Sequence, residues 1–203
     1  MNFFSFKKVA FTALVVSGFT LSGCLTDDKD DTKDSIPVVV VDSVKTKTVV
    51  LGAQDNAKAG SVDLDTWTAY TANEGVTSYA SIDIVFAFST KTSEASIYSP
   101  NIAKNGVSGG SGGFDFMANW PNANTTSLKI PAAAFDFAKV TTGAAVKAGY
   151  DAGTDPTVAG KVPVAVGTVI LVKTDKGLHV ALKVTAVTAS ATGTLDLTGI
   201  AKW

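Results

Sequence analysis

The chain contains no arginine: all 17 basic residues are lysines, set against 18 acidic residues, and the formal net charge is −1. Arginine is the usual side chain for bidentate recognition of phosphates and base edges, and nucleic-acid-binding domains carry basic clusters. The composition therefore argues against a nucleic-acid partner.

Cysteine and histidine occur once each, as Cys24 and His179. A single cysteine excludes an internal disulfide, and any Ser-His-Asp or Cys-His triad would have to use His179. That histidine lies within a predicted strand, beside a tight turn, and is interpreted as a surface residue. Zinc sites need three or four ligands at set spacing, so no metal site is expected. A binding role is favoured over an enzyme.

Long apolar runs are also missing, since the longest, at residues 9–20, has about a dozen residues and a membrane-spanning helix needs about 20. Lysines 7 and 8 precede this run, and Leu21-Ser22-Gly23-Cys24 follows it. This pattern predicts a signal peptide over residues 1–23. Its end is similar to the lipobox of bacterial lipoproteins, in which the cysteine thiol receives a diacylglycerol. The alternative is a secretory signal with a cysteine near its end.

Residues 24–35 follow as a predicted tether, because five aspartates and two lysines leave almost no apolar surface to bury. Acidic residues soon after the lipidated cysteine resemble the surface-export signals of some Gram-negative lipoproteins. We therefore expect a membrane partner through the lipid anchor, with outer-membrane localisation and possible display at the cell surface.

The body, residues 36–203, is predicted to be a single β-rich domain. Valine and threonine occur 25 times each, and both favour strands. The predicted fold is mainly β: an antiparallel sandwich or partly open barrel with a few short helices. Helices are expected at 131–139 and 142–150. Strands are expected at 36–41, 45–51, 60–64, 66–70, 81–89, 167–173, 178–188 and 193–200.

Alternation predicts which faces of these strands are shared. In 81–89, Ile82, Ile84, Phe86 and Phe88 fall on one face. In 178–188, Val180, Leu182, Val184 and Ala186 do the same. The Asp-Lys-Gly segment before that strand predicts a hairpin turn, in which Gly177 supplies the left-handed residue.

Acidic pairs and the glycine-rich segment predict no catalysis. Asp63 and Asp65 share a strand face and are interpreted as solvated, not as a glycosidase pair. Asp151 and Asp155 lack the spacing of a calcium loop. Residues 105–113 lack the GK[ST] ending of a phosphate-binding loop.

Aromatic residues are the candidate contacts for a ligand. Trp120 is surrounded by polar residues, among them Asn119 and Asn122, and Trp67 is a second candidate. Aromatic rings in polar loops are typical of sugar-stacking platforms, although core packing explains most aromatic residues in a domain of this size.

Three stretches, 60–71, 81–113 and 166–197, resemble segments of the HmuY-like bacterial outer-membrane surface lipoproteins and related lipoproteins of unassigned function. Trp67 stands where that group usually has glycine. The resemblance implies a mainly-β lipoprotein displayed at the outer membrane. Some characterised members bind haem through two histidines and others through methionines, which implies His179 and Met117 as candidate haem ligands. With one histidine, two-histidine ligation within the chain is impossible.

The sequence thus favours a lipid-anchored, non-enzymatic outer-membrane lipoprotein that binds an extracellular ligand or partner, with a glycan as the generic candidate. A haem-binding lipoprotein that passes haem to a transporter is the alternative, and a structural envelope protein is a further one.

The lipid anchor is directly testable. Cys24→Ser removes the thiol that would carry the lipid, so metabolic labelling with a radioactive fatty acid should be lost and the protein should leave the membrane fraction. Persistent labelling of the variant would contradict the lipobox interpretation.

Overall fold

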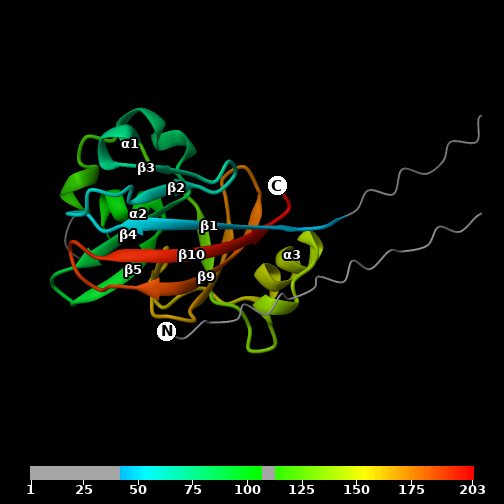
Figure 1. Cartoon of the computed structure of the whole chain (residues 1–203). Coiled ribbons are helices and arrows are strands. Elements are labelled where there is room, and N and C mark those ends of the chain that lie inside the picture. The colour runs from blue at the N-terminus through cyan, green and yellow to red at the C-terminus, as the bar shows by residue number, and fades with distance from the viewer. Residues whose placement is uncertain (1–41, 107–112) are drawn as a thin grey trace, which may run out of the picture. The chain divides into compact units, whose positions relative to one another are not determined.

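Ten strands in the described part of the chain form two antiparallel five-stranded sheets (Figure 1). The computed structural model describes residues 42–106 and 113–203. The predicted signal peptide, Cys24, the tether and the expected strand 36–41 lie outside these residues. The two sheets confirm the predicted mainly-β sandwich. The described residues do not form the alternative, a partly open barrel.

The first sheet has the order β1-β10-β9-β8-β6 and the second the order β3-β2-β4-β5-β7. Neighbouring strands pair antiparallel throughout both sheets. The bounds are β1 Lys45–Gly52, β10 Thr194–Ala201, β9 His179–Val187, β8 Val169–Lys173 and β6 Ser127–Lys129 for the first, and β3 Thr68–Tyr70, β2 Ser61–Asp63, β4 Ile84–Ser89, β5 Glu94–Tyr98 and β7 Lys161–Pro163 for the second.

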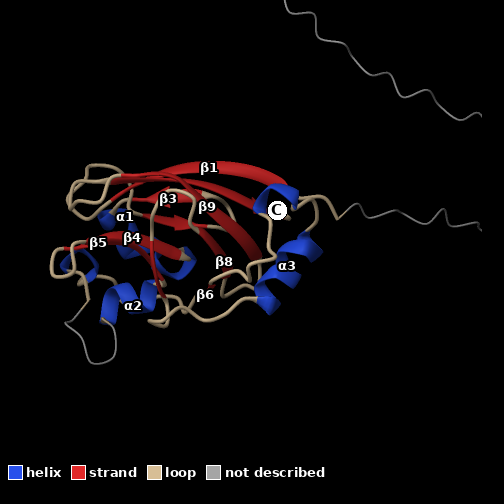
Figure 2. Ribbon diagram, turned by 90° about the horizontal axis from the view of Figure 1, so that it is seen from below, coloured by secondary structure: helices blue, strands red, loops and turns tan. Residues whose placement is uncertain are grey.

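Helices lie outside the two sheets (Figure 2). The α-helices are α1 (Ala72–Ser78), α2 (Pro100–Asn105) and α3 (Gly143–Ala152), and the short 3₁₀ helices are η1 (Tyr79–Ser81), η2 (Asp115–Met117) and η3 (Phe137–Lys139). The helix predicted at 142–150 is confirmed as α3. The one predicted at 131–139 is wrong, because only its last three residues form a helical turn. No helix in the described ranges is long and apolar enough to cross a membrane.

The largest apolar cluster lies between the sheets. It joins side chains from both of them, including Ile84 and Phe86 of β4 with Val180 and Leu182 of β9. The faces predicted from alternation are therefore confirmed for these strands. Ala186 is the exception: the pairing of β9 with β10 shifts register near Thr185, which leaves Ala186 exposed and turns Val187 toward the core.

A second apolar cluster covers the outer face of the β4–β5 sheet. Val85 and Ala87 meet Ala103 of α2, Met117 of η2 and the ring of Trp120 there. A third, smaller cluster packs α3 against the outer face of β8 and β9. Strand β4 is thus covered on both faces, which explains why its sequence is almost continuously apolar.

The second cluster depends on close contact between α1 and Trp120. The Trp120 side chain is 1% exposed, and a Cβ added to Gly75 would lie 2.1 Å from its Cζ2 atom. The Trp120 Nε1–H donates to the Ala72 carbonyl at 3.2 Å. A glycine is needed at position 75 because the indole occupies the space of a side chain.

We expect Trp120→Ala to destabilise the protein by about 3–5 kcal/mol, since it empties a buried ring site. Gly75→Ala should also destabilise it, although alanine has the higher helix propensity by about 1 kcal/mol. Asn73→Ala, at an exposed position of the same helix, is the control and should be nearly neutral. Chemical denaturation measures all three; a Gly75→Ala protein as stable as the control would contradict the packing.

Candidate functional site

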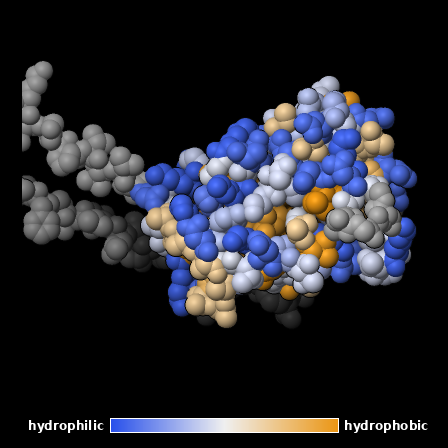
Figure 3. All heavy atoms as spheres, turned by 180° about the vertical axis from the view of Figure 1, so that it is seen from behind, coloured by the Kyte–Doolittle hydropathy of each residue, from blue (hydrophilic) through white to orange (hydrophobic). Residues whose placement is uncertain are grey.

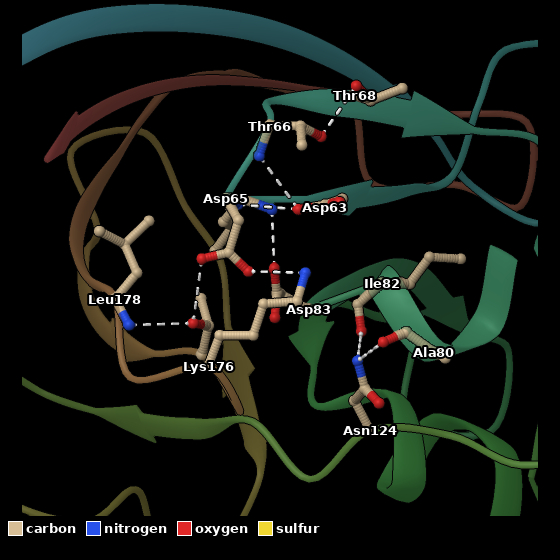
Figure 4. Close-up of polar contacts among 12 residues, drawn as sticks. Asp63, Asp65, Thr66, Thr68, Ala80, Ile82, Asp83, Asn124, Lys176 and Leu178 are labelled. Carbon is tan, nitrogen blue, oxygen red and sulfur yellow. Dashed lines mark hydrogen bonds and ion pairs between the residues drawn. The ribbon is translucent and has the colours of Figure 1, made fainter. Parts of the chain in front are cut away.

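Three aspartates meet where the turn between β2 and β3 crosses the start of β4 (Figure 4). They are Asp63 at the end of β2, Asp65 in the turn and Asp83 just before β4, and we call them the carboxylate cluster. One carboxylate oxygen of each lies within 4.8 Å of the others. Asp63 is 3% exposed and Asp83 is completely buried. The prediction of a solvated Asp63 is therefore wrong.

Backbone groups of the turn fix two of these carboxylates. Asp63 Oδ1 accepts hydrogen bonds from the Asp65 and Thr66 N–H groups, at 2.8 and 3.1 Å. Asp83 Oδ2 accepts one from the Leu64 N–H at 2.7 Å. An aspartate favours such local bonds to its own turn, which is why this residue type stands at position 63.

Trp67 closes the turn with a backbone φ of +62°, a conformation that bulky residues rarely adopt. Its indole N–H donates to the Thr48 carbonyl of β1 at 2.9 Å, and its ring contacts the Trp203 ring edge-on at 5.2 Å. Trp203 in turn donates to the Leu64 carbonyl at 2.6 Å. Trp67, a predicted ligand contact, is therefore partly buried and holds the turn against the first sheet.

The β8–β9 hairpin contributes the groups that face the cluster from the other sheet. Lys176 Nζ lies 3.3 Å from Asp65 Oδ2, and the Thr174 hydroxyl donates to Asp65 Oδ1 at 3.4 Å. Lys176 and Asp65 thus form an ion pair between the hairpin and the turn. Asp83 Oδ1 has no hydrogen-bond partner within the described structure.

Burial raises the pKa of Asp83 to about 7. The Leu64 N–H opposes this rise, while the charges of Asp65 and Asp63 add to it. For Lys176, burial alone would lower the pKa, but the Asp65 carboxylate and the other two acids outweigh it and raise the pKa. The cluster therefore favours protonation of Asp83 and retention of charge on Lys176.

A separate hollow of about 590 Å³ opens beside the β4–β5 hairpin and α2. The rings of Tyr98 of β5 and Phe114 belong to the second apolar cluster and lie at this hollow; Phe88 of β4 also lines it, but its side chain packs against the cluster between the sheets. The rings of Tyr98 and Phe114 meet edge-on at 5.1 Å. The space-filling view from behind shows a few hydrophobic residues among hydrophilic ones (Figure 3).

Polar groups surround these rings. Lys161 of β7 forms an ion pair with Glu94, and its ammonium lies 5.8 Å from the centre of the Tyr98 ring. Gln54 and Thr90 also line the hollow. Gln54 itself bonds both backbone groups of Phe88, at 2.6 and 2.9 Å, and so fixes the end of β4. Apolar rings with a few placed polar groups are typical of small-molecule sites.

The residues predicted as ligand contacts around Trp120 differ in their exposure. Asn119 and Asn122 are exposed, but the ring of Trp120 between them points into the second apolar cluster. A buried ring cannot stack on a sugar, so the prediction of Trp120 as a ligand contact is wrong. A glycan would have to bind at another surface. Asn124 donates to the Ala80 and Ile82 carbonyls, a role that no pattern in the sequence indicates (Figure 4).

His179 and Met117 lie in different parts of the fold. His179 begins β9, is partly buried, and meets the Tyr150 ring edge-on at 5.1 Å. Burial and the charges of Lys147 and Lys173 lower its pKa. Met117 is completely buried beneath the other sheet. The structure does not bring these two candidate haem ligands together.

No protein-family model, curated protein or solved structure matches this chain.

The titration of Asp83 predicts an unusual pH dependence of stability. Its pKa in the folded chain lies above the ordinary value of 3.8, so wild-type stability is lost as the pH rises from about 4 to about 7. Asp83→Asn removes this titration. Between pH 5 and 8 the free energy of unfolding of the wild type should fall by about 2–3 kcal/mol relative to the variant.

Urea denaturation of both proteins in chelator at several pH values measures this difference. His179 has a lowered pKa and shifts stability in the opposite direction, but it is present in both proteins and cancels. Parallel pH curves for the two proteins would contradict a buried, protonated Asp83.

Proposed function

We propose that this protein is a lipid-anchored, non-enzymatic outer-membrane lipoprotein whose β-sandwich binds an extracellular ligand at the hollow beside the β4–β5 hairpin. The lipobox at Leu21–Cys24 and the acidic residues after it support the anchor. The resemblance to HmuY-like surface lipoproteins supports display at the outer membrane.

The observation that carries the binding role is the lining of the hollow. Phe114 is partly exposed there, beside the nearly buried Tyr98 and the charged Lys161. Sugar rings have apolar faces that pack on aromatic rings and hydroxyl groups that need hydrogen-bonding partners, and this lining offers both. A glycan therefore remains the favoured class of ligand, with a contact surface different from the one expected around Trp120.

Haem capture receives less support from this geometry. The candidate ligand Met117 is fully enclosed in the cluster outside the β4–β5 sheet, whereas His179 contacts Tyr150 of the cluster on the other sheet. Binding haem between them would require the sandwich to open.

Thr90 lines the hollow and is exposed, so Thr90→Trp should block it without disturbing the core. We expect the glycan affinity of this variant to fall more than about tenfold, because the new indole would prevent the ligand from making its main contacts. The assay is binding of the full chain, in detergent, to an array of neutral glucans, mannans and acidic polysaccharides. Thr46→Trp, at an exposed position of β1, is the matched control and should bind like the wild type.

Equal binding by the two tryptophan variants would place the contact elsewhere on the domain. A lack of binding by the wild type to every glycan on the array would contradict the glycan class and favour a structural role in the envelope.

A further inference from the structure

The carboxylate cluster has too little positive charge around it. Three carboxylates meet within 4.8 Å, and Lys176 is the one cation paired with them in the described structure. Its side chain is 51% exposed, and its ammonium pairs with Asp65 alone among the three. Asp175, in the same hairpin turn, adds further negative charge to the surroundings. With every carboxylate ionised, the three acids and one ammonium would leave two negative charges.

An unsatisfied oxygen at the bottom of the cluster points to a missing partner. Asp83 has no exposed surface, yet its Oδ1 has no hydrogen-bond partner in the part of the chain that the structure describes. Buried carboxylates normally have a partner for each oxygen, and exceptions call for an explanation such as an ion. Figure 4 shows the Asp83 carboxylate beneath those of Asp63 and Asp65, with Lys176 reaching in from the side.

The donor set determines what kind of ion would fit. All three side chains offer carboxylate oxygens, and the Thr174 hydroxyl is bonded to Asp65 on the hairpin side. Oxygen donors with high negative charge suit hard divalent cations, whereas zinc and copper prefer nitrogen and sulfur. A divalent cation would balance two of the three negative charges that the ionised carboxylates carry once Lys176 has turned away.

We propose that Asp63, Asp65 and Asp83 form a binding site for a hard divalent cation of the calcium class, in which Lys176 is a displaceable counter-ion. The cation bridges the turn between β2 and β3 and the start of β4. Lys176 is free to turn outward because it extends from a hairpin turn and half of its side chain is already exposed. The site is independent of the proposed ligand hollow.

Terbium provides the test, because it replaces calcium and emits when a nearby tryptophan is excited. Trp67 and Trp203 both hold the turn that carries the cluster. We expect saturable terbium luminescence from the full chain in detergent, displaced by calcium. Asp83→Asn and Asp65→Asn should each weaken terbium binding more than about tenfold. Lys176→Met should strengthen it several-fold, because the competing ammonium is gone.

Asp151→Asn is the matched control, since Asp151 is an exposed carboxylate paired with Lys147, and it should bind terbium like the wild type. Calcium should also raise the melting temperature of the wild type, but not that of Asp65→Asn. Asp65 is the less buried ligand, so this variant keeps the test decisive even if Asp83→Asn folds poorly.

Two results would overturn the proposal. Luminescence that is equal in the wild type and in both aspartate variants would assign the ion to other acids, such as those of residues 24–35. No saturable signal, together with no effect of calcium on melting, would mean that a shared proton and Lys176 alone neutralise the cluster.

Discussion

The burial of Asp83 is the constraint on which the arrangement at this end of the sandwich depends. Its carboxylate holds the Leu64 N–H, while Trp203 holds the Leu64 carbonyl from the opposite side. The turn between β2 and β3 is thus fixed between the two sheets through one residue's backbone. A buried ionised carboxylate destabilises the folded state unless its charge is neutralised. A proton, Lys176 or a bound cation therefore has to neutralise Asp83.

Local patterns explain how far the fold could be predicted from the sequence. The core face of β4 follows from the alternation of apolar residues. The β8–β9 hairpin follows from alternation and from Gly177, which has a φ of +88° in the turn. Helices α1 and α2 were missed because Trp120 and Met117, distant in sequence, cover them. The register shift near Thr185 was missed because a bulge depends on the partner strand and leaves no mark in a single strand.

The carboxylate cluster was missed for a different reason. Alternation placed Asp83 beside Val85 and Ala87 and placed Asp63 on a face of its own strand, but it cannot tell which face is covered when helices cover the outside of a sheet. The available signal was one acid inside the apolar run SIDIVFAF. Trp120 illustrates the opposite error, since polar neighbours in the sequence surround a ring that is buried in the fold.

The two candidate sites lie at opposite ends of β4, with Asp83 before its first residue and Phe88 near its last. Five residues of extended chain span about 16 Å, so each site can be altered without touching the other. A displaceable Lys176 distinguishes a cation site from a cluster that a shared proton and the ammonium neutralise. The most direct measurement is a crystal structure of the protein grown with calcium. It should show an ion held by Asp63, Asp65 and Asp83 with Lys176 turned away; an ammonium still paired with Asp65, and no ion, would contradict it.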